Sequence, residues 1–129
     1  AISRSLDNNL SLCVPIAHGE GRYYADANTL DTLKANDQII FTYCTNEGLV
    51  TPDANPNGAI ENIAGVCNTT RNVFGMMPHP ERAADGDLSN TDGKAMFESL
   101  LRCRGQPIEQ SYVPKSHLWK FAPSVPEKK

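Results

Sequence analysis

The sequence predicts an α/β domain, because short apolar runs typical of strands are interleaved with segments of helical spacing. Residues 11–44 contain a strand, a helix and a strand in that order. Residues 63–77 contain two further apolar runs joined by a polar turn, and a helical segment follows at 93–101. This order favours a layered α/β architecture, which is incomplete if the chain is a fragment.

The first of these regions predicts two buried strands around a short helix. Residues 11–17 and 38–44 are continuous apolar runs, as expected of strands that are covered on both faces. Between them, Leu30 and Leu33 are three residues apart and predict an amphipathic helix within residues 26–36. The strand, helix and second strand together form the first half of the expected layer.

The second region predicts an antiparallel hairpin and a final helix. Residues 63–67 and 73–77 are separated by five polar residues, a turn length that suits a hairpin. Residues 93–101 show helical spacing with Asp92 as the expected N-cap. One face of this helix carries the apolar side chains expected in the core: Met96, Phe97, Leu100 and Leu101.

Composition narrows the class of protein. The net charge is -3 and the pI is near 5.5, which argues against a nucleic-acid surface. No apolar run approaches the roughly 20 residues that span a bilayer, and four scattered cysteines without a C-x-x-C pair fit a cytoplasmic setting. We expect one domain over residues 1–104 and an extended or disordered Pro-rich tail over 105–129. The first residue is not methionine, so a fragment or a processed chain is expected.

The most informative stretch is Pro-His-Pro-Glu-Arg at residues 78–82, which follows the hairpin directly. Pro80 disfavours a helical backbone at His79, so the segment should leave its strand extended. In an extended chain, side chains two residues apart lie on the same side, roughly 6.5 Å apart at their α-carbons. The Glu81 carboxylate can therefore reach one imidazole nitrogen of His79, as the orienting group of a catalytic triad does. A rigid turn with a solvated histidine and glutamate is the structural alternative.

Five segments in a fixed order resemble a known family more closely than any single motif does. They are PIAHGEGRYY (15–24), NPNG (55–58), IAGVCN (63–68), GMMPHPER (75–82) and FESLL (97–101). Over roughly residues 10–102, the chain resembles the carboxyl-terminal half of the glutaminase subunits of phosphoribosylformylglycinamidine synthase, which are class I glutamine amidotransferases.

The resemblance implies a three-layer α/β/α, flavodoxin-like domain with a Cys-His-Glu triad. In this family a cysteine thiolate attacks glutamine, and the ammonia released passes to a synthetase subunit that uses it in purine biosynthesis. The resemblance assigns His79 as the general base and acid and Glu81 as its orienting partner. ATP and Mg²⁺ are expected on the synthetase, and no cofactor or metal is expected on this chain.

The triad cysteine has no counterpart in the sequence. In this family it lies on a Gly-x-Cys-x-Gly elbow between a strand and a helix, and none of the four cysteines fits that pattern. Cys67 comes nearest, in Gly65-Val66-Cys67-Asn68, but Thr69 replaces the second glycine and a hairpin turn follows. We therefore expect the isolated chain to be inactive and to need the amino-terminal half of the domain.

Two alternatives remain at this point. His18-Gly19-Glu20 repeats the His-x-Glu pattern of His79 and Glu81, so two imidazoles and two carboxylates could hold a divalent metal in a small metal-dependent enzyme. The chain could instead be a non-catalytic fragment that binds the synthetase.

The first His-x-Glu lies in a glycine-punctuated loop. His18, Gly19, Glu20 and Arg22 are candidates for an active-cleft or interface loop, because the glycines permit close backbone approach. A purely structural role for this loop is equally compatible with the sequence.

Overall fold

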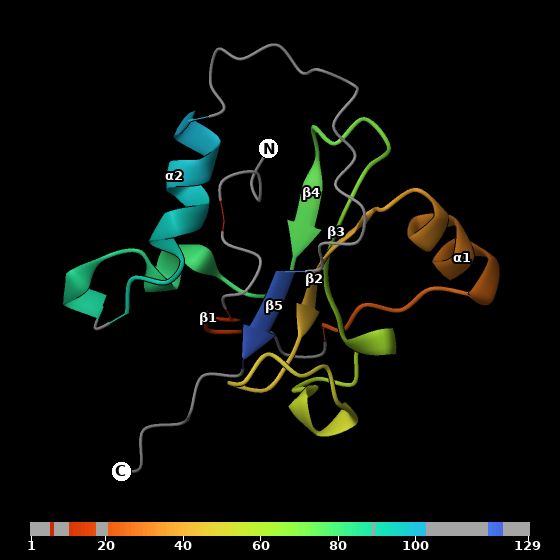
Figure 1. Cartoon of the computed structure of the whole chain (residues 1–129), viewed down its shortest axis with the longest axis horizontal. Helices are drawn as coiled ribbons and strands as arrows, with labels where there is room; N and C mark the ends of the chain where they lie inside the picture. The colour runs from red at the N-terminus through yellow and green to blue at the C-terminus, as the bar shows by residue number, and fades with distance from the viewer. Residues whose placement is uncertain (1–5, 7–10, 18–20, 89, 103–118, 123–129) are drawn as a thin grey trace.

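The computed structural model describes residues 6, 11–17, 21–88, 90–102 and the backbone of 119–122. Its centre is one five-stranded sheet with the strand order β1-β5-β2-β3-β4 (Figure 1). The strands are β1 (Ser11–Cys13), β2 (Ile39–Tyr43), β3 (Ile63–Cys67), β4 (Phe74–Met76) and β5 (Trp119–Ala122). The α-helices are α1 (Ala27–Ala35) and α2 (Lys94–Arg102), which lie on opposite sides of the strands in Figure 1. Short 3-10 helices are η1 (Pro52–Ala54), η2 (Ile60–Asn62), η3 (Pro80–Ala83) and η4 (Gly86–Leu88).

The sheet is mixed. β5 runs parallel to both of its neighbours, β1 and β2, whereas β2, β3 and β4 pair antiparallel in sequence order. The predicted α/β class is therefore confirmed, together with the hairpin, in which Gly65 pairs with Met76 and Cys67 with Phe74.

The helix α1 begins and ends where the sequence predicts. Asp26 is its N-cap, and the Asp26 carboxylate accepts hydrogen bonds from the Thr29 backbone N–H at 2.9 Å and the Thr29 hydroxyl at 3.0 Å. Leu30 and Leu33 are the buried residues of the helix. Their spacing places them on the face that packs inward, while the remaining side chains of α1 are exposed.

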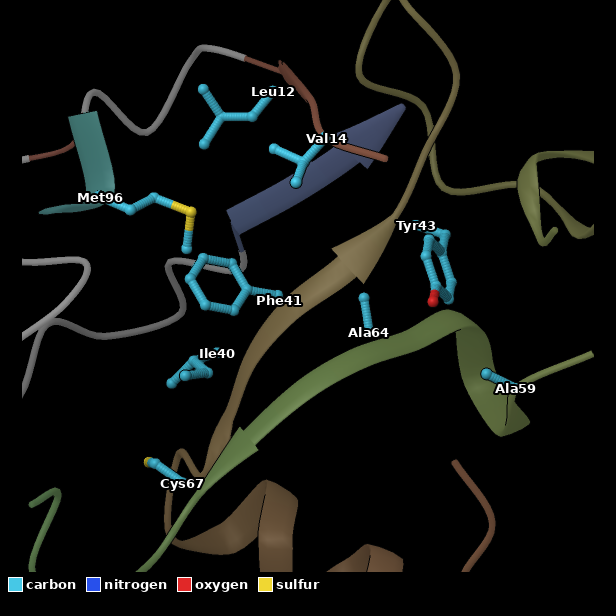
Figure 2. Packing of buried hydrophobic residues seen from close by; sticks show 9 residues of the cluster. All are labelled: Leu12, Val14, Ile40, Phe41, Tyr43, Ala59, Ala64, Cys67 and Met96. Carbon is cyan, nitrogen blue, oxygen red and sulfur yellow. The ribbon is translucent and has the colours of Figure 1, made fainter. Parts of the chain in front are cut away.

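An apolar cluster forms the core of the described residues, and its side chains come from β1, β2, β3, α2 and the segments just after β1 and just before η2. Figure 2 shows Phe41, which is fully buried, on the same side of β2 as Met96 of α2. The members of the cluster are Leu12, Val14, Ile40, Phe41, Tyr43, Ala59, Ala64, Cys67 and Met96. Phe41 and Met96 are both 0% exposed, so α2 packs against the sheet through this cluster.

The second helix differs from its prediction in two respects. It begins at Lys94, and the carboxylate of Asp92, the expected N-cap, instead accepts a hydrogen bond from the Cys13 backbone N–H at 2.8 Å. Phe97 is 38% exposed and Leu101 is 64% exposed. The prediction that these two side chains lie in the core is therefore wrong. Met96 is buried and Leu100 packs partly against the core, so the inward face is narrower than the sequence suggests.

A late segment of the chain contributes β5 to the interior of the sheet, between β1 and β2. Its four residues lie within the predicted tail, and the rest of that tail falls outside the described residues, so the predicted boundary at 104/105 stays a prediction. Among the described residues, neither α-helix has the length and apolar character needed to cross a bilayer.

Candidate active site

The backbone around His79 is fixed to two neighbouring segments. After β4, the Met77 N–H donates to the Ala64 carbonyl of β3 at 3.0 Å. Pro78 is fully buried, and the His79 N–H donates to the Pro15 carbonyl at 2.8 Å. The backbone at His79 is therefore held between the β3–β4 hairpin and the segment that follows β1.

The structure brings His79 and Glu81 together, as the sequence predicts. His79 has a non-helical backbone (φ -105°, ψ 89°), and Glu81 lies in the first turn of η3 rather than in an extended segment. The contact still forms: His79 Nδ1 is 2.8 Å from Glu81 Oε1. The side chains are 35% and 58% exposed, so the pair is accessible to a ligand or to another chain.

The pairing determines the chemistry of the imidazole. A carboxylate only accepts hydrogen bonds, so Nδ1 of His79 carries the proton in this contact. Nε2 of the neutral ring is then left with a lone pair, the form required of a general base. The pKa of Glu81 is held below its usual value, chiefly by its own backbone N–H and further by His79 and Arg82. Glu81 is therefore ionised at neutral pH.

A second set of hydrogen bonds joins η3 and β1 to residues 90–93, just before α2, and the sequence did not predict it. The Gly93 N–H donates to the Ala83 carbonyl at 2.7 Å, which joins the start of α2 to the end of η3. Asp92 accepts from the Cys13 N–H at 2.8 Å, and the Asn90 side-chain amide donates to the Cys13 carbonyl at 2.6 Å. The hydrogen bonds of Asn90 and Asp92 to Cys13 join residues 77 and 79 positions apart in the chain, so no local sequence pattern could have indicated them.

None of the three described cysteines has the environment of an activated thiol. Burial raises the pKa of Cys13, and the nearby Asp92 charge raises it further. Burial also raises the pKa of Cys67, although the Arg71 charge opposes the shift. Cys44 is fully buried in the sheet region. Since the thiolate is the nucleophilic form, these surroundings disfavour the chemistry that the triad needs. Cys103 lies outside the described residues.

The predicted cleft or interface loop is only partly described. His18, Gly19 and Glu20 lie outside the described residues, whereas Arg22 is exposed. A methyl group built on Gly58 would lie 3.5 Å from Arg22 Nη1, which places the guanidinium beside that turn. The loop role of these four residues stays a prediction.

The turn at residues 55–58 also holds the chain just after this loop. The Asn57 side-chain amide donates to the Gly21 carbonyl at 3.2 Å and to the Tyr43 hydroxyl at 3.3 Å. Asn55 Oδ1 accepts from the backbone N–H groups of Asn57, Gly58 and Ala59. Burial raises the pKa of Tyr43 to about 12, so its hydroxyl stays protonated at neutral pH.

The metal alternative finds no direct support in the described part of the chain. Within it, no group of three or more His, Cys, Asp or Glu side chains could hold a metal ion. Two of the four proposed ligands, His18 and Glu20, lie outside that part, so their arrangement relative to His79 and Glu81 is not described.

Comparison with known proteins decides the family. Residues 3–100 match the model of the CobB/CobQ-like glutamine amidotransferase domain, which is more than half of the chain. The chain belongs to this family. Family membership favours the glutaminase interpretation over the metal-dependent enzyme.

The similar curated proteins are subunits of one enzyme. The chain is 60% identical over 90 residues to phosphoribosylformylglycinamidine synthase subunit PurQ of Acaryochloris marina, covering 70% of this chain and 38% of the relative. It is also 60% identical over 88 residues to the Moorella thermoacetica subunit (68% and 37%). For the Thermosynechococcus vestitus subunit the identity is 54% over 104 residues (76% and 43%). The resemblance found in the sequence is confirmed, and the chain spans about two fifths of the length of these relatives.

A similar solved structure is that of PurLQS from Thermotoga maritima. The matched chain is 54% identical to this one, and the match covers 36% of this chain and 22% of the other, with a TM-score of 0.34.

Proposed function

We propose that this chain is the carboxyl-terminal half of a PurQ-type glutaminase domain and supplies the histidine and glutamate of its active site. The observation that carries the proposal is the 2.8 Å contact between His79 Nδ1 and Glu81 Oε1, within the family-matched residues. The complete domain has the three-layer α/β/α, flavodoxin-like fold. Its amino-terminal half supplies the nucleophilic cysteine and the oxyanion-hole backbone.

The proposed reaction uses Nε2 of His79 as the proton acceptor. Nε2 takes the proton from the thiol of the cysteine in the amino-terminal half. The resulting thiolate attacks the side-chain carbonyl carbon of L-glutamine. The imidazolium then gives the proton to the departing nitrogen, so the C–N bond breaks to leave a thioester and ammonia. Glu81 stabilises the imidazolium and holds the ring orientation throughout. Water activated by the same Nε2 finally hydrolyses the thioester to glutamate.

The released ammonia is used elsewhere in the proposed complex. The synthetase subunit of phosphoribosylformylglycinamidine synthase is the expected partner, and ATP and Mg²⁺ bind there rather than on this chain. A cytoplasmic location belongs to the same proposal. The four scattered cysteines, without a C-x-x-C pair, support this location.

Reconstitution tests the proposal. The full chain is co-expressed with the part of the Acaryochloris marina relative that it does not match, and glutamate release from glutamine is measured on the purified complex. We expect activity in the complex and none in the chain alone. Activity of the chain alone that Cys67→Ser abolishes would overturn the assignment of the nucleophile to the other half.

Two variants of the complex test the roles of the site residues. His79→Ala should reduce kcat by about 10²–10⁴-fold, the usual contribution of a general base, and Glu81→Gln should reduce it by less. The matched control is Glu61→Gln, which removes an exposed carboxylate that pairs with Lys34 instead and should leave activity unchanged. A complex that forms but releases no glutamate would favour the non-catalytic binding fragment.

A further inference from the structure

The end of β1 is bound by two side chains from a distant part of the chain. The Asp92 carboxylate accepts a hydrogen bond from the Cys13 N–H at 2.8 Å, and the Asn90 side-chain amide donates to the Cys13 carbonyl at 2.6 Å. A carboxylate only accepts hydrogen bonds and an amide NH₂ donates them. The two side chains therefore bind both main-chain groups of Cys13, as the C=O and N–H of a neighbouring strand would do.

The segment that carries these two side chains also holds η3. The Gly93 N–H donates to the Ala83 carbonyl, the last residue of η3, at 2.7 Å. Within the segment, the Asp92 N–H donates to Asn90 Oδ1 at 2.9 Å, so the two side chains on Cys13 are fixed relative to each other. Four consecutive residues thus join β1 to η3.

The two elements joined in this way support the two members of the His79–Glu81 pair. The His79 N–H donates to the carbonyl of Pro15, which lies two residues after Cys13. Glu81 lies in the first turn of η3. Two residues of chain keep the pair close, but the 2.8 Å contact between Nδ1 and Oε1 also needs a fixed backbone at both positions. The position of β1 relative to η3 therefore affects the orientation of the imidazole.

We propose that Asp92 is a positioning residue for the His79–Glu81 pair and acts together with Asn90 through the backbone of Cys13. The proposal rests on the proposed function, in which His79 takes a proton on Nε2. While Asp92 binds Cys13, the Pro15 carbonyl stays in register with η3 and Nδ1 of His79 faces Glu81. Loss of this contact lets the segment after β1 shift against η3. A displacement of about 1 Å in a catalytic group can reduce a rate about 10²-fold.

Nitrogen-15 NMR of the full chain measures the positioning without any partner. The quantity is the fraction of neutral His79 rings that carry their proton on Nδ1, because a ring that loses Glu81 can carry it on Nε2 instead. Asp92→Ala should lower this fraction at least twofold, whereas Asp92→Asn keeps an oxygen that can accept from Cys13 and should preserve it. Asn90→Asp places a second acceptor against the Cys13 carbonyl and should lower the fraction as Asp92→Ala does. It provides the comparison with Asp92→Asn even if Asp92→Ala does not fold.

The control Leu33→Ala separates positioning from general loss of stability. Leu33 is a buried residue of α1, which lies on the opposite side of the strands from α2 (Figure 1). Its truncation should lower the melting temperature and leave the His79 proton distribution unchanged below that temperature.

Activity of the reconstituted complex gives the second measurement. Asp92→Ala should lower kcat about tenfold and change the KM for glutamine less than twofold, because the contact orients the base and not the substrate. An unchanged proton distribution and kcat in Asp92→Ala would overturn the positioning role, while a loss of activity in His79→Ala would leave the proposed function standing. Equal losses in Asp92→Asn and Asp92→Ala would also overturn the role. If the parent complex releases no glutamate, the proposed function fails and the NMR comparison still decides whether Asp92 positions the pair.

Discussion

Substitution of Gly93 by alanine should disturb the segment that carries His79 and Glu81. A Cβ at Gly93 would lie 2.3 Å from the Pro80 carbonyl oxygen, 2.8 Å from Pro80 Cα and 2.9 Å from the Ala83 carbonyl oxygen. All three atoms belong to the backbone of η3, so no side chain can rotate away to make room. The start of α2 and η3 must therefore separate.

The size of the separation gives the expected cost. Real Cβ contacts begin near 3.0 Å, so the two backbones must part by about 0.7 Å, the difference between 2.3 and 3.0 Å. The hydrogen bond from Gly93 to Ala83, now 2.7 Å, would then exceed the usual limit of about 3.2 Å. Overpacking costs about 1–3 kcal/mol and the lost hydrogen bond about 1 kcal/mol, so we expect about 3 kcal/mol in the free energy of unfolding. For a domain of this size, that corresponds to a melting temperature roughly 10–20 °C lower.

Thermal unfolding of the full chain measures this change, and NMR of the His79 ring protons reports whether the contact with Glu81 loosens. The control is Gly86→Ala in the neighbouring 3-10 helix, where an added Cβ meets nothing within 4 Å; it should stay within about 0.5 kcal/mol of the parent chain. A Gly93→Ala variant with the same melting temperature as Gly86→Ala, and with unchanged chemical shifts of the His79 ring protons, would refute this expectation.

Three further predictions concern ionisation. Tyr43 should titrate with a pKa of about 12 in an ultraviolet titration. Its contribution to stability should be present below pH 10 and lost as pH rises toward 12; Tyr43→Phe should remove the late step. The lowered pKa of Glu81 means that its stabilising contribution is present above the usual carboxyl range and lost as pH falls through the lowered value. Carboxyl NMR that places the pKa of Glu81 at or above the ordinary value of 4.5 would refute this. Because burial raises the pKa of Cys13 and Cys67, iodoacetamide should alkylate both more slowly at neutral pH than it alkylates free cysteine, as mass spectrometry of timed samples can show.

The sequence was most informative where structure depends on neighbours along the chain. Helix α1 follows from the spacing of Leu30 and Leu33, and the hairpin follows from two apolar runs around a polar turn. The contact between His79 and Glu81 was also predictable, because two residues of chain limit how far apart their side chains can lie. It formed even though Glu81 entered a 3-10 turn instead of remaining extended.

The sequence was least informative where distant segments meet. The Pro-rich composition of residues 105–129 did not indicate that Trp119–Ala122 would form β5 between β1 and β2. Asp92 looked like a helix cap because its local surroundings allow that role, but a backbone N–H 79 residues away binds its carboxylate. Phe97 and Leu101 looked like core residues because periodicity shows which face is apolar and not what covers it.

The contact between His79 and Glu81 is supported by segments of this chain alone. His79 is held by the Pro15 carbonyl and η3 by Gly93, and both contacts lie within this chain. The entropy cost of ordering the backbone around His79 and Glu81 is therefore incurred before a partner binds. In the proposed complex, the amino-terminal half needs only to present a thiol to Nε2 of His79. Substitutions near η3 should accordingly change kcat of the proposed complex through their effect on His79.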